Sequence, residues 1–153
     1  MGIAALVAWL LTAVGGFYML ATWITKGGPR QPRTTRFPPA VIFGHFALAV
    51  IGLVIWIIYL VSDADALAWV AFALLIPVAA LGFVMLVRWI PTYRAHTPQA
   101  AVGARTAVGT HTSEDASTVP EKHFSVVVVA GHGLFAAITE VLVLLTALGV
   151  GGS

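Results

Sequence analysis

The chain has 153 residues, of which 59% are hydrophobic and 9% are charged, and its formal net charge is +2. A typical soluble domain is about 45–50% apolar and about 25% charged, so a water-soluble fold of this size could not cover so much apolar surface. Disorder is excluded as well, because disordered chains combine low hydrophobicity with high charge. The absence of cysteine excludes disulfides, thiolate metal sites and covalently attached haem. The composition therefore predicts an integral membrane protein.

Four apolar stretches are long enough to cross a bilayer, which takes ~20 residues. They cover about residues 3–25, 39–61, 66–90 and 119–148, with a long connection at 91–117. We expect Pro91 to end the third helix and a capping box at Thr118–Glu121 to begin the fourth. The predicted fold is an all-α integral membrane four-helix bundle with up-down-up-down topology, and residues 1–153 form one transmembrane domain.

The basic residues fall at one end of this predicted bundle. They are Lys26, Arg30, Arg33, Arg36, Arg88, Arg94, Arg105 and Lys122. The short connection at the other end holds only Asp63 and Asp65. The positive-inside rule then places the protein in the cell membrane with its basic connections in the cytoplasm and both termini outside. Because topology accounts for the positive charge, no nucleic-acid partner is expected. Trp23 and Trp89, near the basic end, are expected in the interfacial aromatic belt.

Two histidines lie well inside the predicted spans. His45 follows Pro39 by six residues, which is ~9 Å along a helix, and His132 follows Phe124 by eight residues, which is ~12 Å. The second and fourth helices run in the same direction, so both imidazoles should lie at one level in the cytoplasmic half of the bilayer. At that level they could bind one metal from opposite sides. The alternative is that each histidine only hydrogen-bonds a carbonyl or a threonine on the next helix.

Glycines flank both histidines in the sequence. Gly44 precedes His45, and Gly131 and Gly133 bracket His132. A glycine beside a histidine ligand removes the side chain where a flat macrocycle must approach the backbone. The alternative is that these glycines only permit close packing of membrane helices.

Glu140 is the third ionisable residue inside the spans. It lies eight residues beyond His132, about 12 Å deeper, so it cannot be a ligand at the same level. Burial of its charge is expensive, so we expect it to be protonated or hydrogen-bonded to Thr12, Tyr18 or Tyr59. It is either a proton relay beside a haem or quinone, or a neutral carboxylic acid bonded within the bundle.

The four-helix layout and the stretches Phe43–Ala47 and Ala130–Gly133 resemble small membrane-bound b-type cytochromes, in which histidines hold haem b between helices. The resemblance implies one haem b ligated by His45 and His132. Its propionates would pair with Arg88 and Arg36, and less strongly with His123. The alternative for Arg88 is that its long side chain only extends to the membrane interface. The sequence departs from the family pattern because related transmembrane electron carriers generally hold two haems with four histidines, whereas this chain has one intramembrane pair. Transmembrane electron transfer would therefore need a partner subunit or a quinone.

Three functions are compatible with these features. The first is a redox subunit that carries haem b. The second is a non-catalytic accessory or assembly subunit of a larger membrane complex, respiratory or transport, in which the histidines only pack. The third is a proton-coupled or metal-ion transporter that uses His45, His132 and Glu140. The expected partners are the lipid bilayer, other membrane subunits or further copies of this chain, and a quinone in the first case. Whether the chain is an enzyme stays open at this point.

Overall fold

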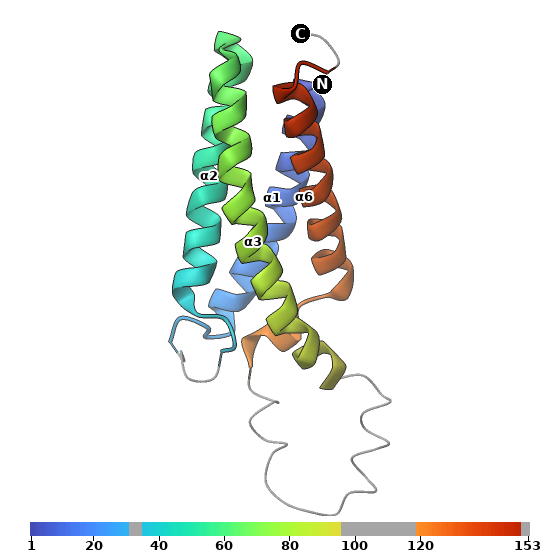
Figure 1. Cartoon of the computed structure of the whole chain (residues 1–153). Coiled ribbons are helices and arrows are strands. Elements are labelled where there is room, and N and C mark those ends of the chain that lie inside the picture. Colours follow the sequence, from blue (N-terminus) through green and yellow to red (C-terminus); the bar gives the residue numbers. More distant parts are fainter. Residues whose placement is uncertain (31–34, 96–118, 151–153) are drawn as a thin grey trace, which may run out of the picture.

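The structure is a computed structural model that describes residues 1–30, 35–95 and 119–150. Its elements are α1 (Gly2–Thr25), α2 (Pro39–Ser62), α3 (Asp65–Ala95), the short 3-10 helix η1 (Pro120–His123) and α6 (Val126–Ala147) (Figure 1). The four α-helices are long and apolar enough to cross a membrane. The predicted all-α fold with four membrane-length helices is confirmed, and these spans indicate a multi-pass membrane protein.

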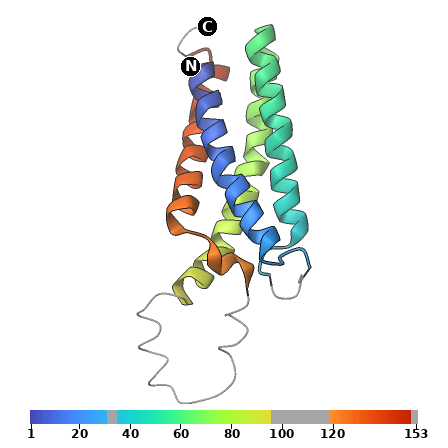
Figure 2. The ribbon, with the colours of Figure 1, turned by 180° about the vertical axis from the view of Figure 1, so that it is seen from behind.

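The four helices form two antiparallel pairs. α1 packs mainly on α6, and α2 packs mainly on α3, while the contacts of α3 with α6 and of α1 with α2 are less extensive. Figures 1 and 2 show the two pairs from opposite sides, with both termini at the end where α2 turns into α3. The connection from α1 to α2 and helix η1 lie at the other end. α2 and α6 therefore lie diagonally across the bundle.

The turn between α2 and α3 is short because Asp63 adopts a left-handed conformation. Its φ is 51°, and its backbone N–H donates to the Tyr59 carbonyl over 2.9 Å, which closes the last turn of α2. Aspartate tolerates this region better than most residues. At the other end of α2, Pro39 occupies the first helical turn, where a missing N–H costs nothing.

The prediction that Pro91 ends the third helix is wrong. α3 runs through both Pro77 and Pro91 to Ala95. A proline removes one N–H donor from the helix but leaves the chain free to continue when the freed carbonyl finds another partner, as membrane helices often allow.

The prediction that the fourth helix begins near residue 119 is also wrong. α6 begins at Val126, and residues 120–123 form η1 instead. The Glu121 carbonyl accepts the indole N–H of Trp89 over 3.3 Å and the N–H of Phe124 over 3.2 Å, so it does not start a continuous α-helix. Thr118, the first residue of the expected capping box, lies outside the described residues.

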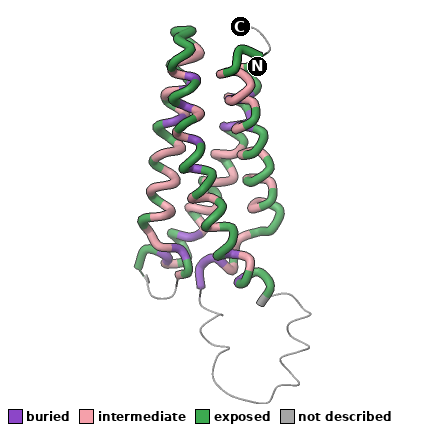
Figure 3. The backbone as a smooth tube through the Cα atoms, in the orientation of Figure 1, coloured by how far each residue is buried: buried purple, intermediate pink, exposed green. Residues whose placement is uncertain are grey.

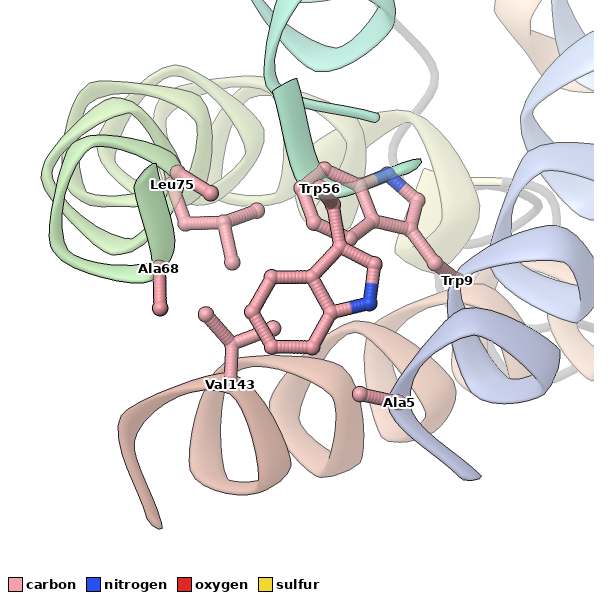
Figure 4. Close-up of a cluster of buried hydrophobic side chains, with 7 residues drawn as sticks. Ala5, Trp9, Trp56, Ala68, Leu75 and Val143 are labelled. Carbon is pink, nitrogen blue, oxygen red and sulfur yellow. The ribbon is translucent and has the colours of Figure 1, made fainter. Parts of the chain in front are cut away.

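The buried side chains gather in two clusters. The termini-end cluster consists of Ala5, Trp9, Trp56, Ala68, Ala71, Leu75 and Val143 (Figure 4). The basic-end cluster consists of Trp23, Phe37 and Trp89. Trp23 and Trp89 are only 1% and 6% exposed, so the expectation that they lie in the interfacial belt is wrong. Gly28 lets Trp23 pack there, because a Cβ at that position would collide with the indole ring.

Between these clusters lies a level of the bundle with almost no buried side chains. We call this level the middle layer. No residue of α1 between Trp9 and Trp23 is buried, and none of α2 before Gly52 or of α6 before Thr139. α3 contributes only Val78 at this level. Figure 3 shows the buried segments toward the two ends of the bundle and intermediate or exposed ones between them. The core is thus divided by a layer without large buried side chains.

Candidate functional site

The imidazoles of His45 and His132 meet in the middle layer. Their ring centroids are 6.3 Å apart, and the ring planes are inclined by 54°. His45 comes from α2 and His132 from α6, so the two rings face each other across the diagonal of the bundle. The expectation that both rings lie at one depth is confirmed.

Each imidazole is held by a backbone carbonyl of the neighbouring helix in its own pair. His45 Nδ1 lies 2.9 Å from the carbonyl oxygen of Val78 on α3, and His132 Nδ1 lies 2.9 Å from that of Thr12 on α1. A carbonyl only accepts, so each Nδ1 donates its N–H and each Nε2 keeps its lone pair. Neither Nε2 has a hydrogen-bond partner in the described part of the chain. Metal-binding histidines commonly donate their other ring N–H in this way.

The separation of the ring centroids can be compared with that of two imidazoles on one metal. Metal–imidazole nitrogen bonds are about 2.0–2.1 Å long, and the centre of an imidazole lies ~1.1 Å behind its nitrogen. Two imidazoles that hold one metal from opposite sides therefore have centroids about 6.3 Å apart. The observed 6.3 Å matches this value.

Glycines on the neighbouring helices allow this close approach. A Cβ on Gly16 would lie 3.1 Å from His132 Cε1, and one on Gly15 would lie 3.3 Å from His132 Cβ. A Cβ on Gly82 would lie 3.3 Å from His45 Cε1. The sequence interpretation missed these three glycines, because nothing in the sequence says which glycine on another helix faces a given histidine.

The glycines beside the histidines in sequence have open space around them on the side of the other helices. A Cβ on Gly131 or Gly133 would meet nothing within 4 Å, and one on Gly44 would touch only Leu81 Cδ1 at 4.0 Å. This open space is compatible with the predicted approach of a macrocycle, and that role of Gly44, Gly131 and Gly133 stays a prediction.

The donor set suits a prosthetic group that brings most of its own ligands. Among the described residues there is no group of three or more His, Cys, Asp or Glu side chains that could hold a bare metal ion. A porphyrin supplies four nitrogens to its iron, so a protein needs to add only two axial ligands. His45 and His132 are two side chains of the type that serves as axial ligands, and a haem between them stays a prediction.

Glu140 lacks the expected hydrogen bonds. The Thr12 hydroxyl donates to the Ala8 carbonyl instead, and Tyr59 packs its ring on Trp56 with centroids 4.9 Å apart. No hydrogen bond or ion pair of the Glu140 carboxyl is found within the described residues. Its side chain is partly buried on the helix that carries His132.

Arg88 and Arg36 lie together at the basic end of the bundle. Arg88 Nη1 donates to the backbone carbonyl of Arg36 over 3.0 Å. Both line a cleft between α2 and α3. Their pairing with haem propionates, and the weaker one of His123, stays a prediction.

Comparisons with protein-family models, curated proteins and solved structures find no match to this chain. The site therefore stands on its own geometry.

Proposed function

We propose that the chain is a membrane redox subunit, similar to b-type cytochromes, that binds one haem b between α2 and α6. The observation that carries the proposal is the pair of imidazoles 6.3 Å apart, each with Nδ1 on a carbonyl, in a layer of the bundle without large buried side chains. A bound haem would supply one-electron oxidation and reduction.

The residues around the pair have distinct tasks in this proposal. His45 and His132 supply the axial nitrogens, and the carbonyls of Val78 and Thr12 fix the ring orientations and increase the basicity of the free nitrogens. The two buried clusters on either side of the middle layer keep water from the site. Apolar surroundings of this kind govern solvent access and so the redox potential.

Electrons would be exchanged with a quinone in the bilayer or with a partner subunit, since one haem does not cover the thickness of the membrane. Glu140, on the same helix as His132 and without a hydrogen bond in the described part of the chain, would serve as the proton relay in this proposal. A carboxyl inside a membrane span is a functional hypothesis by default, because its burial is costly.

Visible spectroscopy of the detergent-purified protein, oxidised and then reduced with dithionite, tests this function. We expect a Soret band and an α band that sharpens on reduction. Protein that is folded and helical, prepared from cells well supplied with haem, but without these bands would contradict the proposal.

The ligands are tested by the single variants His45→Ala and His132→Ala. Each removes one axial nitrogen, so we expect haem content to fall at least tenfold or the bound haem to change its spin state. The matched control is His96→Ala, which removes a histidine from the connection outside the spans. Bands that survive both intramembrane variants unchanged would show that the ligands lie elsewhere.

The second candidate function is an accessory subunit of a larger membrane complex. The hydrogen bonds from both Nδ1 atoms to carbonyls also satisfy histidines that only pack. In that case the protein should fold without haem. His45→Ala should weaken assembly with partner subunits, and there should be no haem absorption bands to lose. The metal-ion form of the transporter alternative gains no support from the described residues, which contain no group of three metal ligands, and the proton-coupled form stays a prediction.

A further inference from the structure

A cleft of about 600 Å³ lies at the basic end of the bundle, between the start of α2 and the last turns of α3. Its lining includes Arg36, Pro38, Pro39, Val87, Arg88 and Pro91. Proline has no N–H to donate, and valine has only an apolar side chain. The cleft therefore combines rigid apolar walls with two cationic side chains.

The two arginines are organised before any ligand arrives. The bond from Arg88 Nη1 to the Arg36 carbonyl, 3.0 Å long, ties the guanidinium of α3 to the segment before α2. A guanidinium has five N–H donors, so most of those on Arg88 stay available for an anion. Thr35, which also lines the cleft, bonds the Glu121 carboxyl. Glu121 is fully buried, so its carboxyl does not face the cleft opening.

The cleft opens on the outside of the bundle and not toward the histidines. Gly82 faces His45, and at ~100° per residue Arg88 is rotated by about 120° from it around α3. Val87 is rotated by about 140° and is 49% exposed. The cleft thus faces the surroundings of the bundle at the level where α2 begins.

We propose that this cleft binds the phosphate of an anionic phospholipid headgroup. The two guanidiniums would take the phosphate oxygens, and Val87 with the proline rings would contact the glycerol and the first acyl carbons. Lipid phosphates lie at this level because α2 enters its apolar span at Pro39. A zwitterionic headgroup fits less well, since its cation would face two positive charges. In this proposal Arg36 and Arg88 hold the lipid phosphate and not haem propionates, so it replaces that pairing and does not require a bound haem.

Native mass spectrometry of the full chain in detergent, titrated with phosphatidylglycerol or phosphatidylcholine, tests the proposal. The wild type is expected to retain phosphatidylglycerol in preference. Each interfacial arginine adds about a fivefold gain for an anionic lipid, so the double variant Arg36→Gln/Arg88→Gln should bind it roughly 25-fold more weakly. Lys26→Gln/Arg30→Gln is the matched control, because it removes the same charge from exposed residues of the same end outside the cleft. It should stay within about twofold of the wild type.

Three results would overturn the proposal. Equal retention of both lipids by the wild type would show that the cleft does not select charge. An equal loss of phosphatidylglycerol affinity in the control variant would show that any basic residue at this end attracts the lipid. Displacement of phosphatidylglycerol by millimolar inorganic phosphate would assign the cleft to a free anion. Circular dichroism checks that each variant is folded. Arg36→Lys/Arg88→Lys, which keeps the charge without the planar fork, should give an intermediate affinity.

Discussion

At the scale of single residues, helical geometry explains which part of the site could be read from the sequence. The depth of His45 and His132 follows from counting residues along two parallel helices, and the rings do meet. The contacts of a ring do not follow from its sequence neighbours, because residues at i±1 on a helix point ~100° away. The glycines that touch the imidazoles, at positions 15, 16 and 82, therefore come from other helices.

This difference gives a prediction about Gly16 and Gly133. A Cβ at Gly16 would lie 3.1 Å from His132 Cε1, so Gly16→Ala must push the ring by a few tenths of an ångström. We expect haem content to fall several-fold, with little loss of helicity because alanine favours helices more than glycine does. In Gly133→Ala the new Cβ meets no atom of another element within 4 Å, so a loss of haem there would report a macrocycle beside this glycine and not a displaced imidazole.

Spectra of the two variants, normalised to protein concentration, are the measurement. Full haem content in Gly16→Ala would contradict the contact assigned between this glycine and the His132 ring. Full haem content in Gly133→Ala would contradict the predicted approach of a macrocycle at that glycine.

At the scale of the elements, local signals predicted α1 and α2 well and failed where distant contacts decide. α2 was expected over residues 39–61 and runs from Pro39 to Ser62, since proline opens it and Asp63 closes it. The start of α6 is different. The indole N–H of Trp89 on α3 donates to the Glu121 carbonyl, and the α-helix begins only at Val126. No pattern within the sequence of residues 119–126 reports a bond to a residue 32 positions away.

The Glu121 carboxyl bonds η1 to the segment before α2. The second prediction concerns the stability that these bonds contribute. Glu121 Oε1 bonds the Thr35 hydroxyl and accepts the Phe37 N–H over 3.2 Å, and the Glu121 side chain is fully buried. Glu121→Ala would remove the acceptor of the Thr35 hydroxyl and one of the two acceptors of the Phe37 N–H, which keeps its bond to Thr35 Oγ1 over 3.1 Å. A lost hydrogen bond costs about 0.5–1.5 kcal/mol. We expect lower thermal stability in detergent and a red-shifted emission from Trp23 and Trp89.

Glu121→Gln is the matched control for this prediction. The amide oxygen can accept the same two bonds, and Oε2 has no hydrogen-bond partner within the described residues, so the exchange should cost much less than alanine does. Thermal unfolding followed by tryptophan fluorescence compares the three proteins. An alanine variant that melts together with the wild type would mean that η1 docks without its carboxyl.

At the scale of the whole molecule, the division of the core into two clusters was not foreseen. Composition and hydropathy predicted four membrane-length helices, and these are present. The pairing of α1 with α6 and of α2 with α3 depends on side-chain shape across helices, which hydropathy does not encode. That pairing places the histidines on diagonal helices and leaves the middle layer between the clusters.

Orientation in the membrane gives the third prediction. The chain has no cysteine, so single cysteines can be introduced without background. Pro29 and Ala64 are exposed and lie at opposite ends of the bundle. The positive-inside rule places Pro29 in the cytoplasm and Ala64 outside. In intact cells a membrane-impermeant maleimide should label Ala64→Cys, whereas Pro29→Cys should react only after permeabilisation. The reverse pattern would contradict the proposed orientation.

The central claim is that two histidines on diagonal helices hold one haem iron together. Electron paramagnetic resonance of the oxidised, haem-loaded protein tests it most directly, because two axial imidazoles make ferric haem low-spin and the loss of one makes it high-spin. We expect one low-spin haem per chain in the wild type, and we expect the low-spin signal to be lost in both His45→Ala and His132→Ala. A low-spin signal that survives in either variant, or a wild type that takes up no haem, would contradict it.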